Sequence, residues 1–303
     1  MASWSGKSRG GRFGYIFFIY LLKKTNIKIV YFFIRFVAFY FFIFSDKKSI
    51  KFYFRNIHKY SKYKTLISIY KNYYLLGQVL VDKISVLSGG KNSFTYNFEG
   101  EEFLRTMVDS KTGGLLIGAH IGNWEVAGQL LKRLEAKVNI VMYEAEHERI
   151  KELLKNNNVV SQANIIPIKN DFSHLFKIQE AFSKKEIVVM HGDRFLEGTN
   201  TIELNFMGKI AQFPTGPLYL ASKNSIPVSY VYAVKETSKH YHFFATEIKI
   251  YPYPANIKKR KEKLEAMLKD YIYSLEKVVE KYPLQWFNYY PFWQEEKENK
   301  LHN

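Results

Sequence analysis

The feature that most constrains the fold is an alternation of short apolar runs with helical segments beyond residue 90. The apolar runs occupy residues 114–119 (GLLIGA), 138–143, 165–168 and 186–190 (EIVVM), and they alternate with helical patterns at 124–134, 147–155 and 172–184. Short continuous apolar runs are typical of strands buried on both faces. The alternation predicts an α/β fold, with a mainly parallel mixed sheet and helices on both of its faces.

The rest of the chain extends this sheet and precedes it with a helical arm. We expect a helix over 217–223, an antiparallel hairpin of strands 226–234 and 242–250, and a long charged helix over 257–281. Residues 45–87 are predicted to form two helices, and the turn-forming cluster SGGKN at 88–92 follows them. We therefore divide the chain into an N-terminal helical arm, residues 1–90, and an α/β domain, residues 91–303.

The arm carries most of the chain's net charge of +17. Residues 1–80 hold fifteen Lys and Arg residues and one acid, Asp46. A basic arm of this kind is attracted to a polyanionic surface, either nucleic acid or anionic lipid. The runs IFFIYLL at 16–22 and IVYFFIRFVAFYFFIF at 29–44 are too apolar for a nucleic-acid arm and match no groove-reading module, so we expect an anionic membrane surface and no nucleic acid. A codon bias towards Lys and aromatic residues explains the richness of the arm but not its missing acids.

The apolar run at 27–45 comes close to the roughly 20 residues that a membrane span needs. It contains Lys28 and Arg35, and an Arg at the bilayer centre costs roughly 2.5–3.5 kcal/mol. A single-span helix and a helix lying in the membrane interface therefore both remain open. Lys23 and Lys24 follow the first apolar run and no small-residue cleavage site is evident, so we expect an uncleaved anchor with its basic flanks on the cytoplasmic side.

Missing motifs exclude several chemistries. The chain has no cysteine, and its eight histidines show neither HExxH nor another paired ligand spacing, so we predict no metal site and no resident cofactor. The sequence has no G-x-S-x-G elbow, which disfavours a serine hydrolase. It also lacks the glycine-rich motifs of nucleoside triphosphatases and dinucleotide enzymes.

The strongest chemical signal is GAHIGNWE at 118–125, where a strand ends in a histidine. On one continuous helix His120 and Glu125 would lie about 140° apart, but they can meet if His120 lies in the turn and Glu125 in the first helical turn, capped by Asn123. Glu125 would then fix the imidazole tautomer while the other ring nitrogen takes a proton from an attacking hydroxyl or amine. Backbone N–H groups at the helix start could stabilise an oxyanion. A structural histidine that caps the turn fits the spacing equally well.

The ordered set of motifs resembles one family, the lauroyl and myristoyl acyltransferases of bacterial lipid A biosynthesis. HIGNWE is similar to that family's H-x4-D/E motif, and the resemblance extends over roughly residues 10–295. Further similar segments, in chain order, are HGDR at 191–194, NFMGKIA at 205–211, FPTGP at 213–217, LA at 220–221, IPV at 226–228 and YPLQWF at 282–287.

The resemblance implies that His120 is a general base oriented by Glu125. It also implies an acyl carrier protein or coenzyme A thioester as donor co-substrate, a hydroxyl of a lipid A-type glycolipid as acceptor, and a location at the cytoplasmic face of the inner (plasma) membrane. Without a Cys or an elbow Ser, direct transfer in a ternary complex fits better than a covalent acyl-enzyme.

The unusual aromatic and lysine content of the arm leaves the acceptor open. An N-acyltransferase for an amino lipid or acyl amino acid, a phospholipid acyltransferase, and a non-enzymatic peripheral membrane protein are the alternatives. The last of these would have no need of His120.

The residues expected at the substrate are Asn123, Asp193, Arg194, Gly208, Phe213, Thr215 and Gly216. Arg194 is suited to a bidentate contact with a phosphate or carboxylate, although an ion pair with Asp193 would also explain it. Gly208, Thr215 and Gly216 are expected to shape a turn and helix start beside the pocket, and plain turn chemistry accounts for the two glycines equally well. Phe213 is a candidate for an acyl groove, although an aromatic residue beside a proline is more often part of a core.

Overall fold

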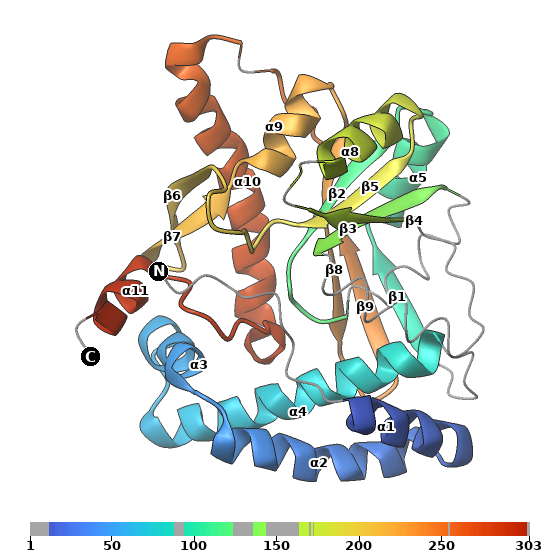
Figure 1. The fold of residues 1–303 in the computed structure, drawn as a ribbon, viewed down its shortest axis with the longest axis vertical. Helices are drawn as coiled ribbons and strands as arrows, with labels where there is room; N and C mark the ends of the chain where they lie inside the picture. Colours follow the sequence, from blue (N-terminus) through green and yellow to red (C-terminus); the bar gives the residue numbers. More distant parts are fainter. Residues whose placement is uncertain are drawn as a thin grey trace.

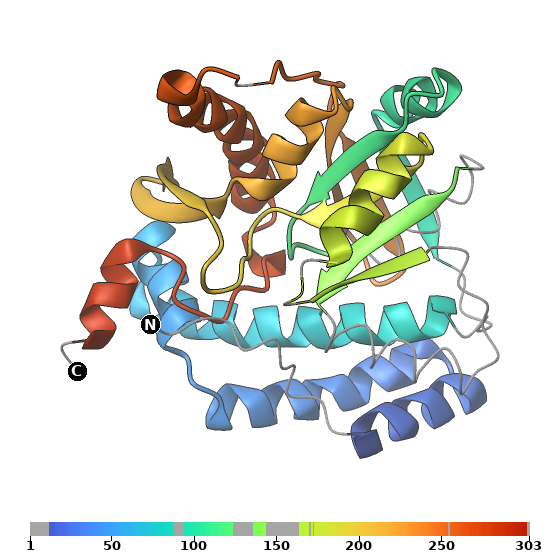
Figure 2. The same ribbon diagram turned by 45° about the horizontal axis from the view of Figure 1, so that its top comes forward.

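The computed structural model of the protein describes residues 12–87, 94–123, 136–143, 164–169, 171, 173–253 and 255–301. A seven-stranded sheet with helices on both faces stands on a layer of N-terminal helices (Figures 1 and 2). Its strands are β1 (Thr95–Glu99), β2 (Gly114–Gly118), β3 (Val138–Tyr143), β4 (Asn164–Ile168), β5 (Ile187–His191), β8 (Val228–Lys235) and β9 (His240–Ala245).

The sheet is mixed but mainly parallel. Its spatial order is β1-β9-β8-β2-β5-β3-β4, and only the pairing of β8 with β9 is antiparallel. The predicted fold class and the predicted antiparallel hairpin, β8 with β9, are therefore confirmed. Because β2 has β5 on one side and β8 on the other, it lies at the centre of the sheet.

The position of β2 explains why its sequence is apolar without alternation. Leu115 and Ile117 join a core formed with α8 (Ser173–Ser183), α9 (Gly216–Lys223) and α10 (Arg260–Lys281). Leu116 points into a second core, with residues of α5 (Glu101–Asp109) and of the N-terminal helices. Both faces of the strand are thus covered, as in other parallel sheets.

A separate hairpin and the C-terminal segment pack against the first core. The hairpin consists of β6 (Thr201–Phe206) and β7 (Lys209–Pro214), and the C-terminal segment includes the 3₁₀ turn η3 (Pro283–Gln285) and α11 (Gln294–Leu301). Phe206 is fully buried among the rings of Trp286, Phe292 and Trp293. This aromatic cluster fixes the segment that follows η3 against the body.

The N-terminal helices form the base of the molecule in Figure 1. They are α1 (Arg12–Lys24), α2 (Ile27–Phe44), α3 (Lys48–Phe52), the π-helical turn η1 (Tyr53–Ile57) and α4 (Lys62–Leu87). Helix α4 packs against the C-terminal segment, where Asn72 Nδ2 donates to the carbonyls of Leu284 (3.0 Å) and Trp286 (3.2 Å). Helix α2 lies outside α4 in both views (Figures 1 and 2).

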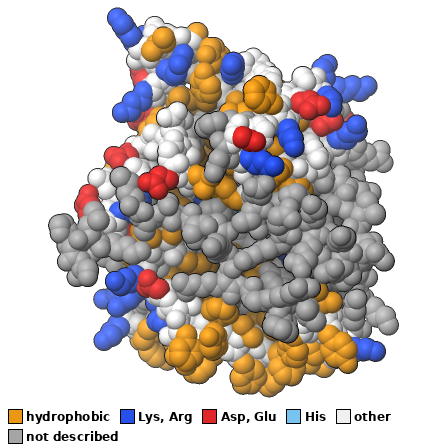
Figure 3. Space-filling view, in the orientation of Figure 1, with side chains coloured by type: hydrophobic (Ala, Val, Ile, Leu, Met, Phe, Trp, Pro, Cys, Tyr) orange, Lys and Arg blue, Asp and Glu red, His pale blue; other side chains and the backbone are white. Residues whose placement is uncertain are grey.

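Hydrophobic side chains gather along the lower edge of the molecule, over the N-terminal helices (Figure 3). Within the described part of the chain, α2 is the one helix long and apolar enough to cross a membrane, judged by length and composition. Core helices of soluble proteins and signal sequences pass the same test.

Several predicted boundaries shift in the structure. The strand predicted at 242–250 is β9, which starts at His240 and ends at Ala245. The side chain of Thr246 accepts a hydrogen bond from the backbone of Tyr230, and beyond it a single antiparallel bridge joins Lys249 to Val228. Three further elements were not predicted, namely β1, α5 and the β6–β7 hairpin. The helices predicted at 124–134 and 147–155, and the boundary cluster at 88–92, lie outside the described residues, so the division at residue 90 stays a prediction.

Candidate active site

Two neighbouring strands bring the candidate residues together. Strands β2 and β5 are parallel, with Gly118 opposite His191, so the residues that follow each strand meet at one edge of the sheet. His120 follows β2, and the segment 191–194 closes β5. This edge is the carboxyl end of the strands, where functional residues of such sheets gather.

Asp193 makes two contacts with His120. Its Oδ1 lies 2.7 Å from His120 Nδ1, and its Oδ2 accepts a hydrogen bond from the His120 backbone N–H at 2.9 Å. One carboxylate therefore fixes both the imidazole and the main chain that carries it. A carboxylate on Nδ1 favours the tautomer with the proton there and leaves Nε2 as the basic nitrogen.

The carboxylate of Asp193 is itself held rigidly. Only 2% of Asp193 is exposed, Trp286 Nε1 donates to Oδ2 at 3.2 Å, and the Tyr290 hydroxyl donates to the backbone carbonyl of Asp193 at 2.9 Å. Burial by itself would raise the pKa of Asp193, but the charge and hydrogen bond of His120 and the charge of Arg194 outweigh it, so the pKa lies below its ordinary value. Asp193 is therefore an anion at neutral pH.

A second histidine faces the first. His191 Nδ1 lies 3.3 Å from His120 Nε2, and the two rings meet at 65° with centroids 4.3 Å apart. Burial and the neighbouring His120 lower the pKa of His191 well below its ordinary value, so His191 is neutral at neutral pH. A neutral imidazole beside Nε2 can exchange a hydrogen bond with His120 without adding a charge.

The turn after His120 is tied to the rest of the molecule through its backbone. Gly122 has φ +63°, and a Cβ atom there would lie 1.8 Å from the carbonyl oxygen of Ala233, so only glycine fits. Its N–H donates to the carbonyl of Gln285 at 3.0 Å, and the carbonyl of His120 accepts from Phe287 N–H at 2.9 Å. The backbone around His120 is thus held between β8 and the C-terminal segment.

Asn123 completes this turn from the inside. Its side chain is fully buried and donates to the carbonyl of Val79 in α4 and to the Tyr241 hydroxyl, both at 3.2 Å. Its N–H donates to the carbonyl of Ala233 at 2.7 Å. These contacts assign Asn123 to holding the turn against α4, and substrate binding by its side chain stays a prediction.

Arg194, the residue after Asp193, contacts the C-terminal segment. Its Nη2 donates to the carbonyl of Phe287 at 2.7 Å, and its guanidinium lies 5.7 Å from the centroid of the Tyr290 ring. Arg194 is half-buried, and its positive charge helps to keep Asp193 ionised.

The remaining predicted residues lie on the β6–β7 hairpin and the turn that follows it. Gly208 is in the hairpin turn with φ +84°, and no heavy atom lies within 4 Å of a Cβ built there. Thr215 is the N-cap position of α9 and its hydroxyl donates to the Asn200 carbonyl at 3.2 Å, while Gly216 is the first residue of that helix.

Phe213 is completely buried against Phe206, Tyr271 and Phe292. The structure therefore places Phe213 in the core behind the site, because its hairpin strand turns it towards α10. Tyr271 carries that packing to the site, since its hydroxyl donates to the Gly118 carbonyl at 3.0 Å.

His120, His191 and Asp193 also form a group of metal-binding type, with ligand atoms within 4.8 Å of one another. Both carboxylate oxygens of Asp193 already accept N–H donors, and Nδ1 of His120 faces that carboxylate. Two facing imidazole nitrogens then remain for an ion. The group is suited to proton transfer more than to holding a metal with three or four ligands.

Glu125, the predicted partner of His120, lies outside the described residues, as does the predicted oxyanion site at the helix start. Three residues of the site, His191, Trp286 and Tyr290, were not among the predicted site residues. His191 carried an available signal, because it closes a strand that neighbours β2. Trp286 and Tyr290 reach Asp193 from a segment 93 and 97 residues away, a contact that no local pattern indicates.

The model of the bacterial lipid A biosynthesis acyltransferase family matches residues 5–295. The chain belongs to the bacterial lipid A biosynthesis acyltransferase family. As a member of this membrane-associated family it is an acyltransferase, and the resemblance drawn from its motifs is confirmed. Comparison with curated proteins gives no match. Among solved structures, the chain is similar to the 1-acyl-sn-glycerophosphate (LPA) acyltransferase PlsC of Thermotoga maritima, at 15% identity and a TM-score of 0.35, over 83% of this chain and 99% of that one.

Proposed function

We propose that this lipid A biosynthesis acyltransferase moves a fatty acyl chain from an acyl carrier protein or coenzyme A thioester to a hydroxyl of a lipid A-type glycolipid. We further propose that His120 is the general base and that Asp193 orients it. The observation that carries this proposal is the double contact of the Asp193 carboxylate with the ring and the backbone of His120. A carboxylate held in this way is suited to fix a catalytic imidazole.

In the proposed reaction the acceptor hydroxyl takes the place beside His120 Nε2. His120 removes its proton as the hydroxyl oxygen forms a bond to the thioester carbonyl carbon. The buried anion of Asp193 stabilises the resulting imidazolium. When the C–S bond breaks, the proton on Nε2 passes to the departing thiolate, which leaves a new ester and a free thiol.

His191 and Trp286 support this cycle in different ways. Because His191 is neutral, it adds no repulsion when His120 becomes charged, and its ring can accept or donate at Nε2 until the acceptor arrives. Trp286 keeps the second oxygen of Asp193 occupied, so that the carboxylate stays aligned with the histidine. Glu125 remains a predicted partner, and its contribution is open to the same assay.

The test compares membranes that contain the wild-type chain, His120→Ala or the matched control His174→Ala. Each receives a radiolabelled acyl thioester of acyl carrier protein or of coenzyme A, and the extracted lipids are separated. We expect wild type and His174→Ala to label one glycolipid and His120→Ala to label none while reaching the membrane in equal amount. Label at the wild-type level in His120→Ala would overturn the assignment of the base, and label in an amino lipid or a phospholipid would overturn the assignment of the acceptor.

A further inference from the structure

The outer face of α2 is a continuous apolar surface, and the ring contact to another helix that the described residues show on it is that of Phe33 with Phe17 of α1, at 6.1 Å between centroids. Its exposed side chains, 36–70% accessible, recur at helical spacing along the whole helix and are Ile29, Phe32, Phe33, Phe36, Val37, Phe39, Tyr40, Ile43 and Phe44. Figure 3 shows this surface along the lower edge of the molecule. A contiguous exposed apolar patch that runs the length of an 18-residue helix marks an interaction site.

The opposite face of α2 is fixed to α4 along most of its length. Tyr31 OH donates to Asp82 Oδ1 at 2.5 Å. Ile34 packs so closely on Gly77 that a Cβ there would lie 2.6 Å from its Cγ2. The Phe42 ring meets Tyr70 with centroids 6.2 Å apart. Residues progressively later in α2 contact residues progressively earlier in α4, so the two helices are antiparallel. Because these contacts extend along the helix, α2 cannot tilt unless α4 moves with it.

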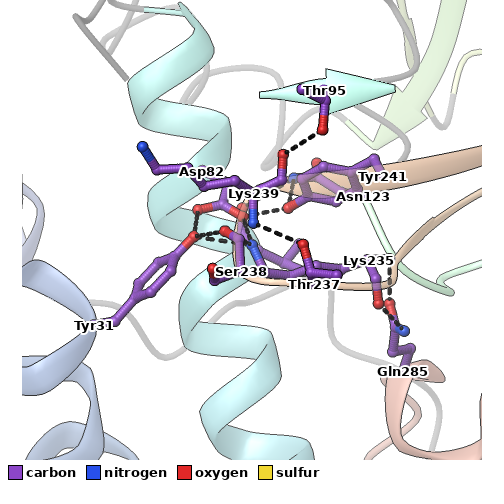
Figure 4. Close-up of polar contacts among 11 residues, drawn as sticks. Tyr31, Asp82, Thr95, Asn123, Lys235, Thr237, Ser238, Lys239, Tyr241 and Gln285 are labelled. Carbon is purple, nitrogen blue, oxygen red and sulfur yellow. Dashed lines mark hydrogen bonds and ion pairs between the residues drawn. The ribbon is translucent and has the colours of Figure 1, made fainter. Parts of the chain in front are cut away.

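A buried polar cluster locks this pairing to the sheet (Figure 4). Lys235 at the end of β8 and Asp82 of α4 form an ion pair whose side chains are 2% and 0% exposed. The hydroxyls of Tyr31 and Tyr241 both donate to the Asp82 carboxylate. Detaching α2 from the body would remove one of these donors from a buried charge, which is costly.

The basic residues of α2 distinguish between two orientations of the α2–α4 pair relative to a bilayer. Lys28 and Arg35 are two helical turns apart, on one flank between the buried and the exposed face of α2. If α2 crossed the membrane, Arg35, which lies at the middle of the helix, would be at the bilayer centre. If α2 lies flat, both basic residues of its flank reach the headgroups, where they complement anionic lipid.

We propose that α2 lies in the plane of one leaflet of an anionic phospholipid bilayer, with its outer face in the acyl region and α4 above it. The protein is then held on one side of the membrane and does not span it. Asn123 of the catalytic turn contacts α4, so the carboxyl ends of β2 and β8 face the bilayer. A lipid acceptor can then approach the site without leaving the membrane surface.

The absence of cysteine makes the test direct, because single cysteines can be introduced without background. Ile29, Phe36 and Ile43 are seven residues apart along the centre of the apolar face, and Lys261 is an exposed control near the start of α10. Each is changed to Cys in the full chain, labelled with a fluorophore and reconstituted in vesicles of phosphatidylethanolamine and phosphatidylglycerol. Nitroxide lipids that quench at the headgroup or at two acyl depths then report where each label lies.

We expect the labels at positions 29, 36 and 43 to lie at one shallow depth, about 5–10 Å into the headgroup and acyl boundary, and Lys261→Cys to be unquenched. A deep label at 36 between two shallow ones would mean that α2 spans the bilayer, and no quenching at any position would mean that the face does not bind lipid. Either result overturns the proposal. Both readings are independent of the chemistry at His120, since no acyl transfer is measured.

A second measurement, in vesicles of the same composition, asks on which side of the membrane each end of α2 lies. A membrane-impermeant thiol reagent is applied to Lys24→Cys and Lys47→Cys, which flank α2, with Lys261→Cys as the reference for the orientation of the body. An in-plane helix predicts that both are modified to the same extent as Lys261→Cys before lysis. Protection of one flank until the vesicles are lysed would contradict it.

Discussion

The buried ion pair between Asp82 and Lys235 provides the most quantitative prediction for stability. Burial raises the pKa of Asp82 and lowers that of Lys235, and their mutual attraction opposes both shifts. Asp82→Asn keeps the shape of the side chain but leaves a buried lysine without its counter-charge. Removing one partner of such a pair costs about 3–5 kcal/mol. At about 2–3 °C per kcal/mol, the midpoint of thermal unfolding should fall by about 6–15 °C.

The matched control is Asp270→Asn. Asp270 forms an ion pair with Lys249 at 2.9 Å, but the two side chains are 37% and 47% exposed. Solvent screens this pair, so its loss should cost less than about 1 kcal/mol. Thermal unfolding of wild type and both variants is measured in the same detergent at pH 7. Equal midpoints for Asp82→Asn and Asp270→Asn would refute the view that Asp82 is a buried charge in need of its partner.

Two further readouts separate loss of charge from loss of packing. The double variant Asp82→Asn/Lys235→Met removes both charges, so it should be more stable than the sum of the single effects predicts, by about 1–3 kcal/mol. In Asp82→Asn the folded state disfavours the proton on Lys235, whereas the unfolded chain keeps it up to a pKa of about 10.4. The unfolded state then binds more protons, so the loss of stability should shrink as pH rises towards that value.

Three further predictions concern the site itself. Gly122→Ala, which adds a methyl group against a carbonyl oxygen at positive φ, should destabilise the protein by more than about 2 kcal/mol in thermal unfolding, whereas Gly198→Ala, at positive φ but in open space, should cost only about 1 kcal/mol. Because the folded-state pKa of His191 is depressed, the unfolded chain binds a proton below about pH 6.5 that the folded chain does not. The free energy of unfolding should therefore decrease as the pH is lowered below about 6.5, and His191→Gln should reduce this dependence. Trp286→Phe keeps an aromatic ring but removes one donor from the charged Asp193, so kcat should fall about 10-fold to 100-fold with KM little changed, and an unchanged kcat would show that this hydrogen bond does not matter for catalysis.

The central sheet could be predicted from the sequence because its strands carry their own signal. GLLIGA and EIVVM are buried on both faces, and they became β2 and β5 almost without change of boundary. Neighbouring parallel strands then bring His120 and the 191–194 segment to one edge, which the order of motifs along the chain indicated. Helices α8, α9 and α10 could also be predicted from the sequence, because each has one apolar face that packs into the core.

The missed elements depend on tertiary contacts. Strand β1 pairs with β9, which is more than a hundred residues away, and its own burial pattern is weak. The β6–β7 hairpin turns at Met207 and Gly208, both with positive φ, instead of at the more familiar Asn-Gly. The sequence of β6, TIELNF, does alternate apolar and polar residues, which is a signal of a half-buried strand.

The contacts of His120 show the same limit within the site. A partner five residues away is the candidate that local spacing offers, and together with the H-x4-D/E motif it predicts Glu125. Asp193 reaches the same imidazole from 73 residues away, through the pairing of β2 with β5. Periodicity can locate an edge of the sheet, but it does not indicate a contact between residues 73 positions apart, and the pairing of His120 with Glu125 stays a prediction.

The central claim is that His120 and Asp193 act as one catalytic unit. The most direct test measures kcat for acyl transfer from a thioester donor by wild type, His120→Ala, Asp193→Asn and the double variant, each checked for folding. The account predicts that Asp193→Asn loses about 10²-fold to 10⁴-fold and that the double variant is no slower than His120→Ala alone, since residues that act as a unit are strongly non-additive. A wild-type rate in Asp193→Asn, or losses that multiply in the double variant, would contradict it.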